Sequence, residues 1–133
     1  MESSFQFMSD ERDEEQKLSQ ILVRDDRYRR EAYRFVQEGL EFTMQRRGRR
    51  GHVSGRELVL GMRELARERF GLMARTVLNQ WGITGTADFG ELVFNMIEED
   101  IMSKQDSDTR ADFANIYDFE EAFERDMKIE LED

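Results

Sequence analysis

The sequence predicts a mainly α-helical single domain of five or six helices with a small C-terminal β-hairpin. Three observations lead to this fold class. The 133 residues include no proline, whereas an average chain contains about 5%, and proline is the residue that interrupts helices. Apolar residues recur at helical spacing as far as residue 99. Beyond residue 100 this period is lost, and two short apolar runs flank a polar segment.

The first part of the chain is expected to form a flexible polar leader over residues 1–12, with the domain spanning 13–133. Leu18, Ile21 and Leu22 have the i, i+3, i+4 spacing of a short helix over 14–23. Asp25-Asp26 offers an N-cap for a second helix over 27–46, which a wide apolar face places at the centre of the fold.

The third helix has a clear start, because Ser54-Gly55-Arg56-Glu57 has the capping-box form Ser-x-x-Glu. Apolar residues then continue in one helical phase: Met62, Ala66, Phe70, Met73, Val77 and Trp81. This common phase predicts that Gly71 bends one helix rather than separating two. Gly82 follows at the position where glycine ends helices, and Thr86 is expected to cap a further helix that ends near Glu99.

The C-terminal part is expected to contain strands over 101–104 and 114–118 and a last helix that Asp118 caps. A helix over 72–81, a turn, a helix over 87–99 and a hairpin follow one another in the order of a winged helix-turn-helix, so the domain is expected to be winged-helix-like. The helix over 87–99 carries no lysine or arginine. Phosphate would therefore repel it, which favours protein contact or an architectural role over the reading of DNA bases.

Composition excludes several function classes. Without cysteine there is no disulfide, thiolate nucleophile or thiolate metal site, and a single histidine excludes multi-histidine zinc sites. The net charge of -10 opposes broad binding to nucleic acid or anionic lipid. No apolar run approaches the 20 residues of a membrane span, and no secretory signal is visible. The expected location is the cytoplasm, and no cofactor is predicted.

Charge is segregated along the chain. Residues 1–23 carry a net charge of -4, residues 24–75 carry +6 and residues 76–133 carry -12. Either the basic middle packs against the acidic C-terminal part, which we favour, or it contacts an external anionic partner. Within the middle, Arg46, Arg47, Arg49 and Arg50 form a basic glycine-containing loop followed by His52. These five residues are the candidate contact site for an anion or partner, because guanidinium groups bind phosphate and carboxylate in bidentate fashion.

Other candidate chemistry is weak. Asp106, Asp108 and Asp112 are candidate cation ligands, but an EF-hand loop that starts at Asp106 would need glycine at Ala111 and glutamate at Tyr117. A solvated turn explains this cluster better. No arrangement of residues indicates catalysis, so the chain is predicted not to be an enzyme.

Six segments occur in an order that resembles a known protein family: Tyr33-Arg34-Phe35-Val36, His52-Val53-Ser54-Gly55-Arg56-Glu57-Leu58, Phe70-Gly71-Leu72-Met73-Ala74-Arg75-Thr76-Val77-Leu78, Trp81-Gly82-Ile83, Thr86-Ala87-Asp88-Phe89-Gly90-Glu91-Leu92-Val93-Phe94 and Tyr117-Asp118-Phe119. The chain is similar over residues 27–123 to an uncharacterised family of small acidic proteins from planctomycetes, verrucomicrobia and their relatives. The resemblance implies a cytosolic bacterial protein and supplies no activity and no functional residues.

The leading functional hypothesis is therefore a non-enzymatic protein-binding or adaptor protein that uses the basic loop and the acidic C-terminal part. The alternative is a nucleic-acid or ribosome-associated protein that contacts phosphate through the arginines of residues 46–50.

Overall fold

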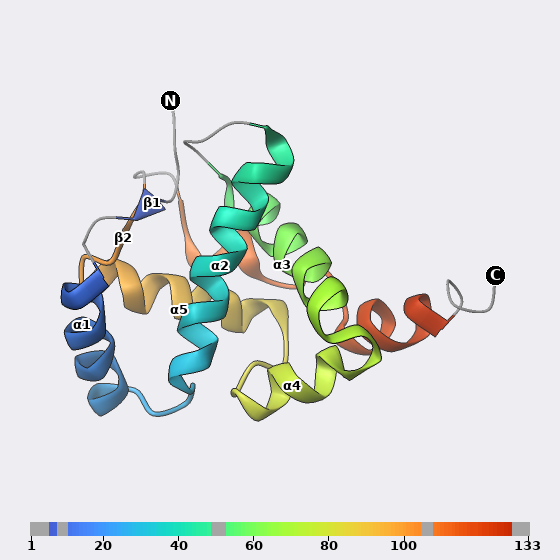
Figure 1. The fold of residues 1–133 in the computed structure, drawn as a ribbon, viewed down its shortest axis with the longest axis horizontal. Helices are drawn as coiled ribbons and strands as arrows, with labels where there is room; N and C mark the ends of the chain where they lie inside the picture. Colours follow the sequence, from blue (N-terminus) through green and yellow to red (C-terminus); the bar gives the residue numbers. More distant parts are fainter. Residues whose placement is uncertain (1–5, 8–10, 49–52, 105–107, 129–133) are drawn as a thin grey trace.

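The computed structural model describes residues 6–7, 11–48, 53–104 and 108–128, and this part of the chain is mainly helical (Figure 1). Its α-helices are α1 (Glu11–Arg24), α2 (Arg30–Arg47), α3 (Gly55–Phe70), α4 (Ala74–Gln80) and α5 (Thr86–Glu98). Shorter elements are the 3₁₀ helices η1 (Gly71–Met73) and η2 (Arg110–Phe113), the π-helical segment η3 (Glu121–Arg125), and strands β1 (Gln6–Phe7) and β2 (Met102–Ser103). The prediction of a mainly helical fold is confirmed.

Helix α5 lies at the centre, behind α2 in the view of Figure 1, and contacts α1, α2, α3 and η2. Eight of its residues are buried: Thr86, Phe89, Gly90, Leu92, Val93, Phe94, Asn95 and Met96. Residues on most sides of α5, and not only on its predicted apolar face, are therefore buried in the core. Rings from several elements meet there, and Phe35 lies 5.8 Å from Trp81 and 6.4 Å from Phe89 between ring centroids.

Helices α2 and α3 pack closely because glycines face larger residues across the contact. A Cβ atom on Gly61 would overlap the hydroxyl of Thr43, and one on Gly39 would overlap the side chain of Met62. The Thr43 hydroxyl is itself fixed, since it donates a 2.7 Å hydrogen bond to the Gly39 carbonyl. This close approach determines the shape of the surface between the two helices.

Phe113, at the end of η2, is fully buried between α3 and α5. A Cβ atom on Gly55 would lie 3.3 Å from the Phe113 ring, and one on Gly90 would lie 2.9 Å from the Phe113 Cβ. The ring of Phe94 meets it edge-on at 6.4 Å. Two glycines thus create the slot that holds the C-terminal segment against the helices.

The predicted hairpin over 101–104 and 114–118 is wrong. Strand β2 pairs in antiparallel fashion with β1, with Gln6 opposite Ser103 and Phe7 opposite Met102, so part of the segment expected as a leader forms this ladder. Residues 114–118 form no strand: Asn115 has φ +53°, and the Ile116 amide donates to the Thr86 hydroxyl. The apolar residues of this segment anchor a loop to helices rather than alternating across a sheet.

The winged-helix-like arrangement is not confirmed, since the described residues lack the hairpin that would form the wing. The helix that would occupy the recognition position is α5, and it is the buried centre of the fold. No helix in the described part is long and apolar enough to cross a bilayer.

Two predictions about helix ends are also wrong. Gly71 separates helices rather than bending one, because its φ of +56° and ψ of -134° lie outside helical space and suit glycine. The helix expected from Arg27 begins instead at Arg30, with Arg29 as an N-cap that has no side-chain cap bond. The Arg29 amide donates to the Trp81 carbonyl at 3.1 Å, which fixes the start of α2 against the turn after α4.

The remaining caps form largely where the sequence places them. Ser54 and Glu57 make both bonds of the capping box, at 2.9 and 3.1 Å. Gly82 has φ +97°, and the Ile83 amide donates back to the Leu78 carbonyl as in a Schellman motif. Asp118 accepts from the Glu121 amide at 3.0 Å and caps the last helix. Thr86 is the first residue of α5 rather than its cap.

Candidate functional site

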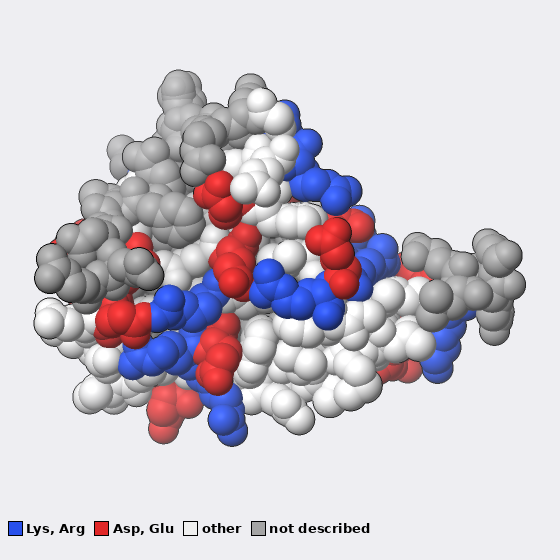
Figure 2. All heavy atoms as spheres, in the orientation of Figure 1, with Lys and Arg blue, Asp and Glu red and all other residues white. Residues whose placement is uncertain are grey.

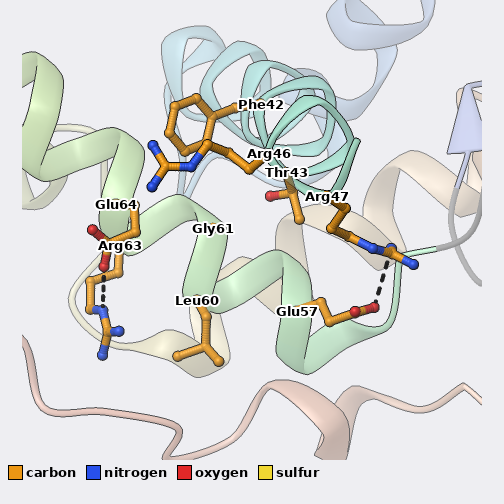
Figure 3. Close-up of a pocket in the computed structure, with 9 residues that line it drawn as sticks. All are labelled: Phe42, Thr43, Arg46, Arg47, Glu57, Leu60, Gly61, Arg63 and Glu64. Atoms are coloured by element: carbon orange, nitrogen blue, oxygen red, sulfur yellow. Dashed lines mark hydrogen bonds and ion pairs between the residues drawn. The ribbon is translucent and has the colours of Figure 1, made fainter. Parts of the chain in front are cut away.

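A groove of about 270 Å³ lies between the C-terminal half of α2 and the N-terminal half of α3 (Figure 3). Its lining combines apolar and small residues with three arginines and two glutamates: Phe42, Thr43, Arg46, Arg47, Glu57, Leu60, Gly61, Arg63 and Glu64. Gly61 and Thr43 lie where the two helices approach most closely, and the groove opens outward from that contact. It is the candidate functional site because it includes the described part of the predicted arginine cluster.

Of the four arginines in the predicted cluster, the structure describes Arg46 and Arg47, and their surroundings differ. Arg46 is exposed, and its guanidinium lies 5.2 Å from the centroid of the Phe42 ring, which is cation–π distance. The Arg47 side chain is only 19% exposed and lies 3.3 Å from the Glu57 carboxylate. Figure 3 shows this pair joining α2 to α3 at one end of the groove. The other predicted contact residues, Arg49, Arg50 and His52, lie outside the described residues.

The remaining charges of the groove are mutually paired. Arg63 Nε lies 3.2 Å from a Glu64 carboxylate oxygen, and its guanidinium lies 5.5 Å from the Tyr117 ring centroid. Burial raises the pKa of Tyr117 above its ordinary value, and the Tyr117 hydroxyl donates to the Val59 carbonyl at 3.1 Å. The other two groove arginines, Arg47 and Arg63, are thus paired with glutamates. For Arg46, the described part of the chain shows no carboxylate partner.

The acidic C-terminal part is engaged by arginines from elsewhere. Arg24 lies 3.1 Å from Glu98, and Arg75 lies 3.1 Å from Glu124. Arg67 donates to the Ala122 carbonyl at 2.8 Å. The basic middle of the chain therefore does pack against its acidic C-terminal part, as expected. The described contacts come from α1, α3 and α4 and from Arg27 in the loop after α1, which lies 3.1 Å from Glu91.

A polar network ties the loop between α1 and α2 to α5. Asn95, only 4% exposed, donates to Asp25 at 2.9 Å and to the Tyr33 hydroxyl at 3.0 Å. Arg27 donates to the same Asp25 carboxylate at 2.7 Å. These hydrogen bonds, above all the one from Arg27, hold the pKa of Asp25 well below its ordinary value of 3.8. Burial raises the pKa of Tyr33.

This network predicts a specific acid sensitivity. Because the pKa of Asp25 is lower in the folded chain than the ordinary 3.8, its stabilisation is fully present above that pH and is lost as the pH falls below it. We expect Asp25→Asn to lower the urea midpoint at pH 7 and to lower it less at pH 2.5, where part of this stabilisation has been lost. Asp26→Asn, at an exposed neighbour, is the control. A difference from wild type that stays constant between the two pH values would contradict this assignment.

The candidate cation ligands are not brought together in the described structure. Asp112 accepts from the Thr109 amide at 3.0 Å and so caps η2. Asp108 lies before that cap, and Asp106 lies outside the described residues. Within the residues that the structure describes, no group of three acidic or histidine side chains is placed to hold a metal ion.

A second pocket, of about 350 Å³, lies at the N-terminal end of α5. Most of its polar side chains already have partners within the chain. The Thr86 hydroxyl accepts from Ile116, and Asp118 accepts from Glu121. Asp88 binds the amides of Thr84 and Gly85, so nothing at this pocket calls for a ligand.

The sequence reasoning missed an uncharged surface formed by η1 and α4. From Phe70 to Ala87 the chain has one charged residue, Arg75, and that residue pairs with Glu124. Leu72 is 43% exposed and Met73 is 58% exposed. In Figure 2 the surface over α4 lacks the alternating charges that cover α2. Counting charges in successive segments of a chain that is 38% charged would have revealed it.

Comparison of the chain with protein-family models, with curated proteins and with solved structures found no match. Membership of the family of small acidic bacterial proteins therefore stays a prediction.

Proposed function

We propose that the protein is a non-enzymatic protein-binding or adaptor protein whose main contact is the uncharged surface of η1 and α4. The observation that supports this proposal is the exposure of Leu72 and Met73 within a stretch that has a single charged residue. Protein interfaces are depleted of charge at their centre and enriched in methionine and aromatic residues. Val77 and Trp81 follow Met73 at i+4 and i+8 and are half-buried, which extends the surface along α4.

The partner is expected to be a different protein that presents an uncharged, partly apolar patch. A charged group on the partner would lose its hydration here without gaining an ionic partner, because Arg75 is already paired. A second copy of the chain is the less favoured occupant, since two molecules of net charge -10 repel each other. Contact through the basic loop and the acidic C-terminal part, which the sequence favours, would add to this surface.

The test is the double substitution Leu72→Glu with Met73→Glu. Both side chains are exposed, so we expect the fold to be retained while the contact is lost. Proteins cross-linked to the tagged chain in extracts of its host would be quantified for wild type and variant. We expect one set of proteins to fall at least about tenfold with the variant, which corresponds to about 1.4 kcal/mol.

The matched control adds two negative charges on another face, through Gln20→Glu with Val23→Glu on α1, where both residues are exposed. This control should capture the same proteins as wild type. Equal capture by the η1 variant and wild type would refute the proposal. A wild-type dimer in light scattering that the η1 variant separates would also refute it, because the occupant would then be a second copy.

The alternative is a nucleic-acid or ribosome-associated protein that contacts phosphate through the arginines of residues 46–50. It is supported by the exposure of Arg46 and by the lack of a carboxylate partner for it in the described part of the chain. It requires RNA binding that strengthens steeply as salt falls and that weakens when Arg46, Arg47, Arg49 and Arg50 become alanine. Fluorescence anisotropy with a single-stranded RNA at 20 mM salt measures this, and no binding there would exclude it.

A further inference from the structure

The groove between α2 and α3 has the two components of a peptide-binding site. Phe42 and Leu60 supply apolar lining, and both are only half-buried. Figure 3 shows Arg46 beside Phe42 on α2, on the side of the groove opposite Gly61. Its volume of about 270 Å³ lies below the range of about 300–1,000 Å³ that is usual for small-molecule pockets. It suits one large side chain of a longer segment.

The charge of the groove favours an anionic occupant. Three arginines and two glutamates line it, and the two glutamates already bind Arg47 and Arg63. Glu57 is held further by the Ser54 amide in the capping box. Arg46 is left as an exposed guanidinium without a carboxylate in the described part of the chain, and the Phe42 ring orients it. A carboxylate bound to Arg46 would form a charge-assisted pair at the edge of an apolar surface.

We propose that this groove binds an acidic peptide segment of a partner protein, with one large apolar side chain against Phe42 and Leu60 and a carboxylate on Arg46. The inference goes beyond the contact through η1 and α4, because it concerns another surface and another partner chemistry. A protein with both surfaces would join an uncharged partner patch to an acidic segment, which is what an adaptor does.

The test uses the full chain and the peptide acetyl-Asp-Glu-Phe-Glu-Asp-amide, followed by ¹H–¹⁵N correlation spectra. We expect saturable shifts of the Gly61 and Thr43 amides and none at the distant Gly85 amide. Two control peptides separate the components of recognition. One replaces the acids with asparagine and glutamine, and the other replaces phenylalanine with alanine. Each should bind at least about tenfold more weakly, because each lacks one of the two contacts.

Arg46→Glu should reduce the affinity for the acidic peptide at least about tenfold, and Arg46→Gln should reduce it less. Arg29→Glu is the matched control, because it makes the same change in net charge at an exposed residue at the opposite end of α2. It should bind like wild type. Equal losses for Arg46→Glu and Arg29→Glu would show that only net charge acts, and this would overturn the proposal.

A single-stranded oligonucleotide tests the competing occupant in the same spectra. Shifts at Gly61 with the oligonucleotide but not with the peptide would overturn the proposal in favour of phosphate binding. Absence of saturable shifts with the acidic peptide would also overturn it. Neither result would affect the test at Leu72 and Met73, since those residues lie outside the groove.

Discussion

Replacement of Gly82 with alanine should be among the most destabilising single-methyl changes in this protein. Gly82 has φ +97°, and a Cβ atom there would overlap the backbone carbonyl oxygen of Arg27. Strain at such a backbone costs about 1–3 kcal/mol, and overpacking against an atom that cannot rotate away costs about 1–3 kcal/mol more. Urea denaturation followed by circular dichroism would measure the loss against a total stability of about 5–15 kcal/mol.

The control is Gly48→Ala, at the end of α2. Gly48 also has a positive φ, of +74°, but its Cβ position has no atom within 4 Å. The control should therefore lose only the strain contribution. If both variants lost the same free energy of unfolding, the close approach between the α4–α5 turn and the loop before α2 would contribute nothing measurable to stability.

Phe113→Ala is expected to lower the free energy of unfolding by about 3–5 kcal/mol, the usual range for a buried phenylalanine. The cost should be at the upper end of this range because Gly55 and Gly90 have no side chains, so the Phe113 ring alone fills the space between them. Removal of the ring creates a cavity between α3 and α5 that backbone cannot easily close. Thermal and urea unfolding would both report the loss.

A double-mutant cycle tests whether the slot is the cause. Gly90→Ala places a methyl group 3.0 Å from two ring carbons of Phe113, so it should destabilise the wild type by about 1–3 kcal/mol. In the Phe113→Ala background those ring carbons are absent, and the cost of Gly90→Ala should be smaller. Simple additivity of the two losses would show that the ring and the glycine do not share one packed site.

The parts of the fold that depend on nearby residues were predictable from the sequence. Helical spacing placed most of α1, α2, α3 and α5, and the capping box located the start of α3, because these signals act within four residues. The break at Gly71 was not predictable in this way. The apolar phase continues through it, yet Met73 turns outward and is 58% exposed. The helical spacing of apolar residues does not by itself reveal that the backbone dihedral angles of one residue are not helical.

The predictions that failed are those that depend on contacts between residues far apart in the sequence. Residues 114–118 look strand-like in sequence, but Phe113 and Phe119 on either side of them are buried as separate anchors on the helices. The arginine cluster was visible as a run of like residues, whereas the groove beside it depends on how α2 and α3 cross. That crossing is set by Gly61 and Thr43, which lie 18 positions apart and carry no signal that links them.

The attachment of α1 has a consequence for the order in which the chain folds as it is made. Arg24 at its end pairs with Glu98 and binds the Asn95 carbonyl, and β1 just before α1 pairs with β2 at Met102–Ser103. Synthesis proceeds from the N-terminus, so these partners do not yet exist when α1 leaves the ribosome. Leu18 and Ile21, both fully buried in the finished fold, gain their full cover only after about a hundred residues have emerged. Of the helices that the structure describes, the first in the chain is thus among the last to be secured.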